Sequence, residues 1–187
     1  PLSLIRPSKT DKSQTITWDH YRKLFVNKDN IDKGKRFIST HIVSLEKAQK
    51  NYGVPPEVIA AIIGIETKYG KNQGKFPVFD TLATLAFESS GRENFFREEL
   101  EAFILLCLNQ GLQINKIKGS YAGALGIPQF MPSSWRTFAI DFDQNGKTNL
   151  LISPKDAIGS VANYLQKHGW DRNIPTHSVA IPEPGSN

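Results

Sequence analysis

Apolar residues recur every three or four positions along most of this chain, which is the spacing of amphipathic helices. The segments with this pattern are 18–52, 57–70, 78–88, 93–111, 133–141 and 153–170, and the first is long enough for two helices. No segment shows the strict apolar–polar alternation of a half-buried strand, and no repeat or low-complexity run is present. The pattern therefore predicts a mainly α-helical protein.

Proline, glycine and polar clusters divide the chain into parts. Residues 1–17 are polar and predict a mobile lead-in, and 18–52 form an N-terminal helical segment. Residues 53–170 hold most of the other helices and predict the core, whereas 171–187 are a proline-containing tail. The length of 187 residues fits one domain, or one domain with a small appendage.

Charge and cysteine usage narrow the function classes. The net charge of +5 arises from 23 basic and 18 acidic residues, and several basic residues lie within 21–37. A solvated helical face explains this cluster more simply than a polyanion site, and no nucleic-acid motif accompanies it, so we expect no nucleic-acid partner.

The single cysteine, Cys107, excludes an internal disulfide and predicts a small buried hydrophobe. No apolar run approaches the ~18 residues of a transmembrane segment.

One carboxylate draws attention in the helix predicted for 57–70. Glu66 follows three isoleucines by seven, four and three positions, so all four side chains share one helical face. These isoleucines are Ile59, Ile62 and Ile63. Either Glu66 pairs with a basic neighbour such as Lys68 or Lys71, or desolvation raises its pKa so that it delivers a proton near neutrality. The residues alone leave both interpretations open.

Three long motifs carry a resemblance to a known family. They are YGVPPEVIAAIIGIETKYGKNQGKFPVFDTLATLAF, GSYAGALGIPQFMPSSW and DAIGSVANYLQKHGW. In this order they resemble the membrane-bound lytic transglycosylase B family of peptidoglycan-cleaving enzymes, from about Trp18 to Trp170. The resemblance implies a lysozyme-like helical core over 53–170 with an N-terminal helical extension. It also places the family's catalytic glutamate on Glu66, whose carboxyl is then expected to be buried as a proton donor.

The chemistry that this resemblance implies uses one acid. Glu66 protonates the glycosidic oxygen between N-acetylmuramic acid and N-acetylglucosamine, then takes the proton of the C6 hydroxyl as that oxygen attacks C1. The product is a 1,6-anhydromuramoyl end, and catalysis requires no cofactor. Two alternatives stay open. One is a hydrolytic muramidase with Asp80, Glu88 or Asp141 as a second acid, and the other is a non-catalytic peptidoglycan-binding module.

Further residues are assigned to the substrate groove by the same resemblance. Ser120 and Gln129 are expected to contact the sugar beside the scissile bond, with turn or loop chemistry as the alternative. Phe130 is expected to line the groove. Tyr164 and Tyr21 match groove tyrosines, and each has a core role as its alternative. The glycines of the glycine-rich segment, GSYAGALGIPQFMPSSW, are expected to let the backbone approach a sugar closely.

The loop DFDQNGKTNLLI follows the EF-hand calcium template over its first half. Asp141, Asp143 and Asn145 offer side-chain oxygens, and Lys147 offers a carbonyl. The last template position holds isoleucine instead of a bidentate glutamate. By resemblance a later aspartate closes the site, and Asp156 is the nearest match, although SPKD also predicts a capping box for it. We expect weak, structural calcium binding, with a metal-free turn as the alternative.

The implied substrate indicates the place of action. We expect the periplasm or cell envelope, with a lipid anchor on an N-terminal segment outside this chain as one option. The chain begins at Pro1 without a methionine, which indicates a processed or trimmed N-terminus. Peptidoglycan glycan strands are the expected partner, and a monomer is the expected state.

Overall fold

The computed structural model describes residues 17–88 and 91–176. Its helices are α1 (Trp18–Phe25), α2 (Lys28–Thr40), α3 (Ile42–Tyr52), α4 (Pro56–Thr67), α5 (Val78–Glu88), α6 (Glu93–Gln110), α7 (Pro132–Phe138) and α8 (Pro154–Lys167). The other elements are β1 (Phe76–Pro77), β2 (Lys118–Gly119) and the 3₁₀ turn η2 (Ile114–Lys116). The predicted lead-in up to residue 16 and the 177–187 part of the predicted tail lie outside the described residues.

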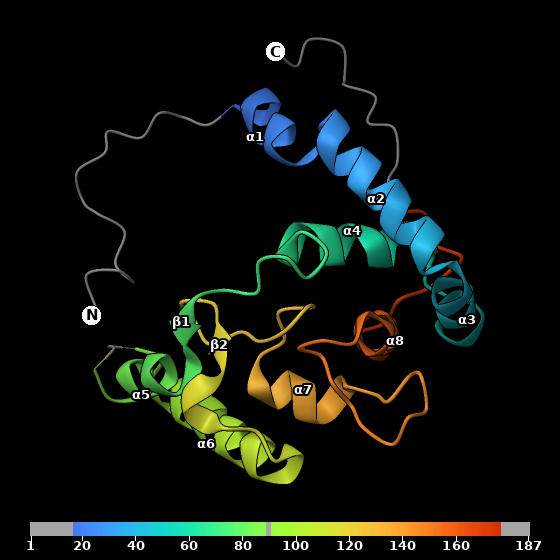
Figure 1. Ribbon diagram of the computed structural model, residues 1–187. Helices are drawn as coiled ribbons and strands as arrows, with labels where there is room; N and C mark the ends of the chain where they lie inside the picture. Colours follow the sequence, from blue (N-terminus) through green and yellow to red (C-terminus); the bar gives the residue numbers. More distant parts are fainter. Residues whose placement is uncertain (1–16, 89–90, 177–187) are drawn as a thin grey trace.

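The helix that carries Glu66, α4, lies near the centre of the molecule (Figure 1). It packs against α2, α3 and α8, while α6 packs against α5 and α7. The core is apolar, and its fully buried side chains include Ile63 of α4, Phe103 of α6 and Ile158 of α8. Cys107 is 3% exposed and belongs to this core, as predicted. The arrangement confirms the mainly α-helical prediction.

The N-terminal helical segment differs from the expected two helices. It contains three, because the chain turns between α2 and α3 at His41. The backbone hydrogen bonds continue through this corner: the His41 N–H donates to Phe37 O, and the Leu45 N–H donates to His41 O, each over 3.0 Å. The imidazole packs on the Phe37 ring with centroids 4.6 Å apart. Because apolar spacing continues through the corner, the pattern alone did not reveal it.

The structure also contains a short sheet that the sequence pattern did not predict. β1 and β2 pair antiparallel, with Phe76 opposite Gly119. Isolated bridges join Leu125 to Gly119 and to Phe130, so the glycine-rich segment folds back on itself beside the sheet. Strands of two residues are too short for alternation to be recognised. Their pairing brings the segment after α4 alongside the glycine-rich segment.

Candidate active site

Glu66 lies in the last turn of α4, and its side chain is exposed. The expectation of a buried carboxyl is therefore wrong. Ile59 and Ile63 are fully buried. Ile62 is only half-buried and Ile65 is 59% exposed, so the glutamate stands at the edge of the apolar face. Neighbouring protein atoms still displace part of its water, and this desolvation raises the pKa of the carboxyl above its ordinary value.

The salt-bridge alternative for Glu66 is not seen in residues 17–88 and 91–176. Within these ranges the ion pair that forms joins Lys33 and Asp29, and neither Lys68 nor Lys71 pairs with the glutamate. The carboxyl can therefore gain and lose a proton without breaking an ion pair.

A strained turn follows the glutamate. α4 ends at Thr67, three residues before the end of the helical segment 57–70 that the sequence predicted. Lys68, Tyr69 and Gly70 then have φ values of 51°, 63° and 82°. This is the left-handed backbone conformation, which residues other than glycine rarely adopt. The Tyr69 ring lies against α4, where a Cβ on Gly64 would come within 2.6 Å of its hydroxyl oxygen. Glycine at position 64 therefore makes room for this turn.

Gln129 lies close to the segment that follows this turn. Its backbone is left-handed, with φ of 52°. Its Nε2 donates to Gly126 O over 2.9 Å and to Gln73 O over 3.1 Å. The amide nitrogen is thus used inside the protein, as the loop-capping alternative expected. No hydrogen bond to its Oε1 is found within the described ranges, so this oxygen stays available to a ligand.

Ser120 is half-buried and shapes a turn. Its Oγ accepts hydrogen bonds from the N–H groups of Ala122 and Ala124, over 3.2 Å and 3.0 Å. This is the turn chemistry named as its alternative role. The hydroxyl hydrogen is not consumed by these two contacts, so Ser120 can still donate to a ligand.

The glycines of this segment are required by the protein's own packing. A Cβ on Gly119, Gly123 or Gly126 would lie 2.2, 2.4 or 2.5 Å from atoms of neighbouring residues. At Gly126 the obstructing atom is the carbonyl oxygen of Leu150, and φ is 69°. The tight approach is therefore between two parts of the chain, which differs from the expected approach to a sugar.

The two expected groove aromatics on the C-terminal side pack together. Phe130 is 8% exposed and belongs to the core. Its ring lies 5.4 Å from that of half-buried Tyr164, which also contacts Phe138 at 5.1 Å and His168 at 4.0 Å. Burial favours a supporting role for Phe130, beneath a surface to which Tyr164 contributes.

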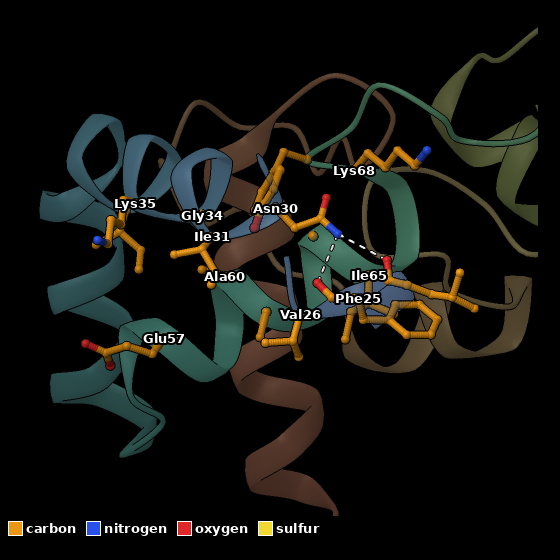
Figure 2. A pocket seen from close by; sticks show the side chains of 15 residues that line it. Phe25, Val26, Asn30, Ile31, Gly34, Lys35, Glu57, Ala60, Ile65 and Lys68 are labelled. Carbon is orange, nitrogen blue, oxygen red and sulfur yellow. Dashed lines mark hydrogen bonds between the residues drawn. The ribbon is translucent and has the colours of Figure 1, made fainter. Parts of the chain in front are cut away.

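Tyr21 stands on α1, beside an apolar pocket. It is 49% exposed, and its ring lies 5.1 Å from that of Phe25. Phe25 lines a pocket of about 430 Å³ between α1, α2 and α4, together with side chains such as Ile31 and Ile65 (Figure 2). Glu66 is not among the residues that line it. The pocket thus adjoins the glutamate in sequence but does not contain it.

A buried carboxylate that sequence reasoning missed lies on α6. Glu99 is 3% exposed, and its two oxygens accept hydrogen bonds from the N–H and the hydroxyl of Ser133, over 2.9 Å and 2.6 Å. Ser133 is in the first turn of α7, where unpaired N–H groups favour an anion. Glu99 follows Phe96 by three positions and precedes Phe103 by four, which made it a candidate for burial but did not identify Ser133 as its partner.

The carboxylates expected at the acidic loop do converge. Asp141, Asp143 and Asp156 each place an oxygen within 4.8 Å of the others. Within the described residues Asp143 Oδ1 is buried without a hydrogen-bond partner. The oxygens of fully buried Asp156 accept from the N–H groups of Phe142 (3.0 Å) and Asn149 (2.8 Å). An orphan buried oxygen beside two further carboxylates matches the needs of an oxygen-binding cation, so these residues fit calcium.

The other predicted ligands of the acidic loop are exposed. Asn145 Oδ1 accepts from the Lys147 N–H over 3.0 Å, a contact within the turn itself. Ser153 caps α8 as predicted, because its Oγ accepts from the Asp156 N–H over 3.2 Å. The reciprocal half of the predicted capping box does not form, since the Asp156 carboxylate is bonded to the acidic loop and its flank.

Residues 2–186 match the family described as Transglycosylase SLT domain. The chain belongs to this family. It is also 46% identical over 153 residues to the membrane-bound lytic murein transglycosylase B of Escherichia coli (strain K12). That match covers 82% of this chain and 42% of the relative, so the matched part is less than half the length of that protein.

Solved structures of lytic transglycosylases share the fold. SltB1 from Pseudomonas aeruginosa matches with a TM-score of 0.85 and 45% identity, over 92% of this chain and 57% of that one. Slt35 from Escherichia coli, in complex with calcium, matches with a TM-score of 0.81 and 46% identity, over 83% of this chain and 49% of that one. SltB3 from Pseudomonas aeruginosa, in complex with NAG-anhNAM-pentapeptide, matches with a TM-score of 0.77 and 35% identity, over 83% of this chain and 41% of that one. These likenesses confirm the expected lysozyme-like helical core.

Proposed function

We propose that this chain is the catalytic part of a lytic transglycosylase that cleaves the β-1,4 bond between N-acetylmuramic acid and N-acetylglucosamine in peptidoglycan. Family membership and the likeness to lytic transglycosylases over most of the chain support this activity. The SltB3 complex with NAG-anhNAM-pentapeptide favours an anhydro product over a hydrolytic one. The observation that carries the proposal is Glu66, an accessible carboxyl of raised pKa at the end of α4.

The reaction uses this carboxyl twice. Protonated Glu66 donates its proton to the glycosidic oxygen, the bond from that oxygen to C1 of the muramic residue breaks, and C1 becomes oxocarbenium-like. The C6 hydroxyl oxygen of the same sugar then bonds to C1, and the Glu66 carboxylate accepts the hydroxyl proton. The glutamate ends protonated, and no water is consumed. A raised pKa serves the first step because a larger fraction of the carboxyl then carries its proton at a given pH.

Four side chains that the resemblance assigned to the substrate groove are proposed to hold the glycan. Ser120 donates its remaining hydroxyl hydrogen, and the free Oε1 of Gln129 accepts from an N-acetyl N–H or a sugar hydroxyl. Tyr21 and Tyr164 offer ring surface for a sugar face. Phe130 supports Tyr164 from below, which revises its role from lining the groove to shaping it.

Calcium is proposed as a structural ion of the acidic loop. Asp141, Asp143 and Asp156 would hold it, and the resemblance adds Asn145 and the Lys147 carbonyl. When bound, the ion supplies positive charge that offsets the repulsion between three neighbouring carboxylates. The complex of Slt35 with calcium supports this assignment. No proton transfer is assigned to the ion, because Glu66 performs both.

The proposed place of action is the periplasm or cell envelope, acting on glycan strands as a monomer. The Escherichia coli relative is membrane-bound, and its name refers to murein. In residues 17–88 and 91–176, no helix combines the length and the apolar character needed to cross a bilayer.

The test of the proposed function is Glu66→Gln, with Glu57→Gln, an exposed change on the same helix, as the matched control. We expect release of anhydromuropeptides from purified peptidoglycan to fall by at least about 10²–10⁴, the usual worth of general acid–base catalysis. Glycan binding and the activity of the control should persist. Mass spectrometry identifies the anhydro end, which is lighter by one water than a hydrolytic product. Normal release by Glu66→Gln, or hydrolytic ends from the parent protein, would overturn the proposal.

The raised pKa of Glu66 also has a stability consequence that serves as a folding control. The folded protein binds this proton more tightly than the unfolded chain does, so its stabilising effect is complete at acidic pH and is lost as pH rises through the folded pKa. Removing the ionisable group removes that loss. Glu66→Gln should therefore melt at neutral pH at a temperature no lower than the parent protein.

A further inference from the structure

We infer that Thr67 is a positioning residue for Glu66, holding the end of α4 against the turn that carries Gln129. The inference rests on the proposed function, because it concerns the placement of the proposed acid. Thr67 directly follows the glutamate and is 1% exposed, whereas the glutamate itself is accessible. A buried hydroxyl next to an exposed acid is in a place to fix that acid's backbone without contacting substrate.

The Thr67 hydroxyl is fully used in hydrogen bonding. Its Oγ1 donates to Ile127 O over 2.8 Å, across 60 positions of sequence. The same oxygen accepts from the Gly70 N–H over 2.9 Å. A second acceptor within α4, Ile63 O, is more distant at 3.3 Å, so the one hydroxyl hydrogen is shared unequally in favour of Ile127. The hydroxyl therefore links α4, the following turn and the glycine-rich segment.

These contacts hold a turn that is strained. Lys68 and Tyr69 have positive φ directly after Thr67, a conformation that persists only where surrounding interactions over-determine it. Thr67 bonds both to the turn and beyond it, because its hydroxyl accepts from Gly70 N–H and its carbonyl accepts from Asn72 N–H over 2.9 Å. Without the hydroxyl, the half-buried Gly70 N–H loses its acceptor and the end of α4 loses its link to Ile127.

The other end of the link reaches the proposed sugar contact. Ile127 accepts from Thr67 at its carbonyl, and its N–H donates to Leu150 O over 2.8 Å, so its peptide is held on both sides. Two residues later, Gln129 donates to Gln73 O over 3.1 Å. Glu66 and Gln129 are thus placed relative to each other by two cross-segment hydrogen bonds. Of these, the bond from Thr67 is the nearer to the acid along the chain.

The experiment compares Thr67→Val, which keeps shape but removes the hydroxyl, with Thr67→Ser, which keeps the hydroxyl. Thr81→Val, at a buried threonine on α5, is the matched control. On soluble uncrosslinked glycan strands, we expect kcat of Thr67→Val to fall about 10- to 100-fold with KM changed by less than about threefold, the size of effect that a small misplacement produces. Thr67→Ser and Thr81→Val should keep kcat within about threefold of the parent.

Melting temperatures and glycan binding separate positioning from stability. All kinetics are run well below the lowest melting temperature, and binding is measured in a Glu66→Gln background with and without Thr67→Val. If Thr67→Val does not fold, Thr67→Ala replaces it, and Thr67→Ser must then exceed it in kcat by about 10-fold. Equal kcat for hydroxyl-bearing and hydroxyl-free variants overturns the inference while leaving the proposed function intact. Full activity of Glu66→Gln alone would instead overturn the proposed function.

Discussion

The buried carboxylate of Glu99 gives a prediction that depends on geometry alone. Its two oxygens accept from the N–H and hydroxyl of Ser133 in the first turn of α7, and the residue is 3% exposed. Glu99→Ala removes both acceptors at once. Ser133 then keeps a backbone donor and a hydroxyl at a helix start with no partner, and the space left by the side chain is not filled.

The magnitude follows from those two bonds. Hydrogen bonds to a charged group contribute about 1.5–3 kcal/mol each, so the two bonds to Ser133 together set the scale of the loss at several kcal/mol. We expect Glu99→Ala to lower the free energy of unfolding by about 3–5 kcal/mol, which for a domain of this size is about 6–20 °C in melting temperature. Glu99→Gln keeps one acceptor oxygen, so its loss should be smaller, about 1–3 kcal/mol.

The assay is denaturant unfolding followed by circular dichroism, applied to Glu99→Ala, Ser133→Ala and the double variant. The coupling energy between the two sites should be about 0.5–3 kcal/mol, because each single change removes a shared contact. Glu98→Ala, at an exposed neighbour on the same helix, is the control and should change stability by less than about 0.5 kcal/mol. A loss below about 1 kcal/mol for Glu99→Ala, or additive single effects, would show that this contact does not hold α7.

Two further predictions concern ligands. Calcium at millimolar concentration should raise the free energy of unfolding of the parent protein by about 0.4–1.4 kcal/mol if its dissociation constant is about 10⁻⁴–10⁻³ M. Asp143→Asn should abolish that gain, and in chelator this variant should be at least as stable as the parent. Melting curves with calcium and with chelator check this, and identical parent curves would leave the loop a plain turn. Ser120→Ala or Gln129→Ala should weaken transition-state binding by about 0.5–3 kcal/mol for each lost hydrogen bond, and unchanged kcat/KM at an intact melting temperature would return both residues to purely structural roles.

The sequence by itself was enough to locate the helices of the core and the family. Pro56 lies in the first turn of α4, and Gly111, with φ of 63°, directly follows α6; these are the positions at which helices favour proline and glycine. Three motifs in order indicated the family that the comparison then showed. These signals act within a turn or two of chain, or as contiguous residue strings, so short windows of sequence contain them.

Only the tertiary structure decided which carboxylate is buried. Glu66 and Glu99 both lie at helical spacing from apolar residues, yet the first is exposed and the second is 3% exposed. Burial depends on what packs opposite each helical face. For Glu99 that partner is Ser133, 34 positions later, and spacing within one helix carries no information about it.

The same reason applies to the contacts between segments that lie far apart in the chain. The spacing within the acidic loop suggested Asp141 and Asp143, but their convergence with Asp156 depends on where α8 begins in space. The hydrogen bond from Thr67 to Ile127 spans 60 positions, and the residues next to Thr67 in the sequence do not predict it. Local periodicity follows from the geometry of one helix, whereas these contacts follow from how separate segments satisfy one another's buried polar groups.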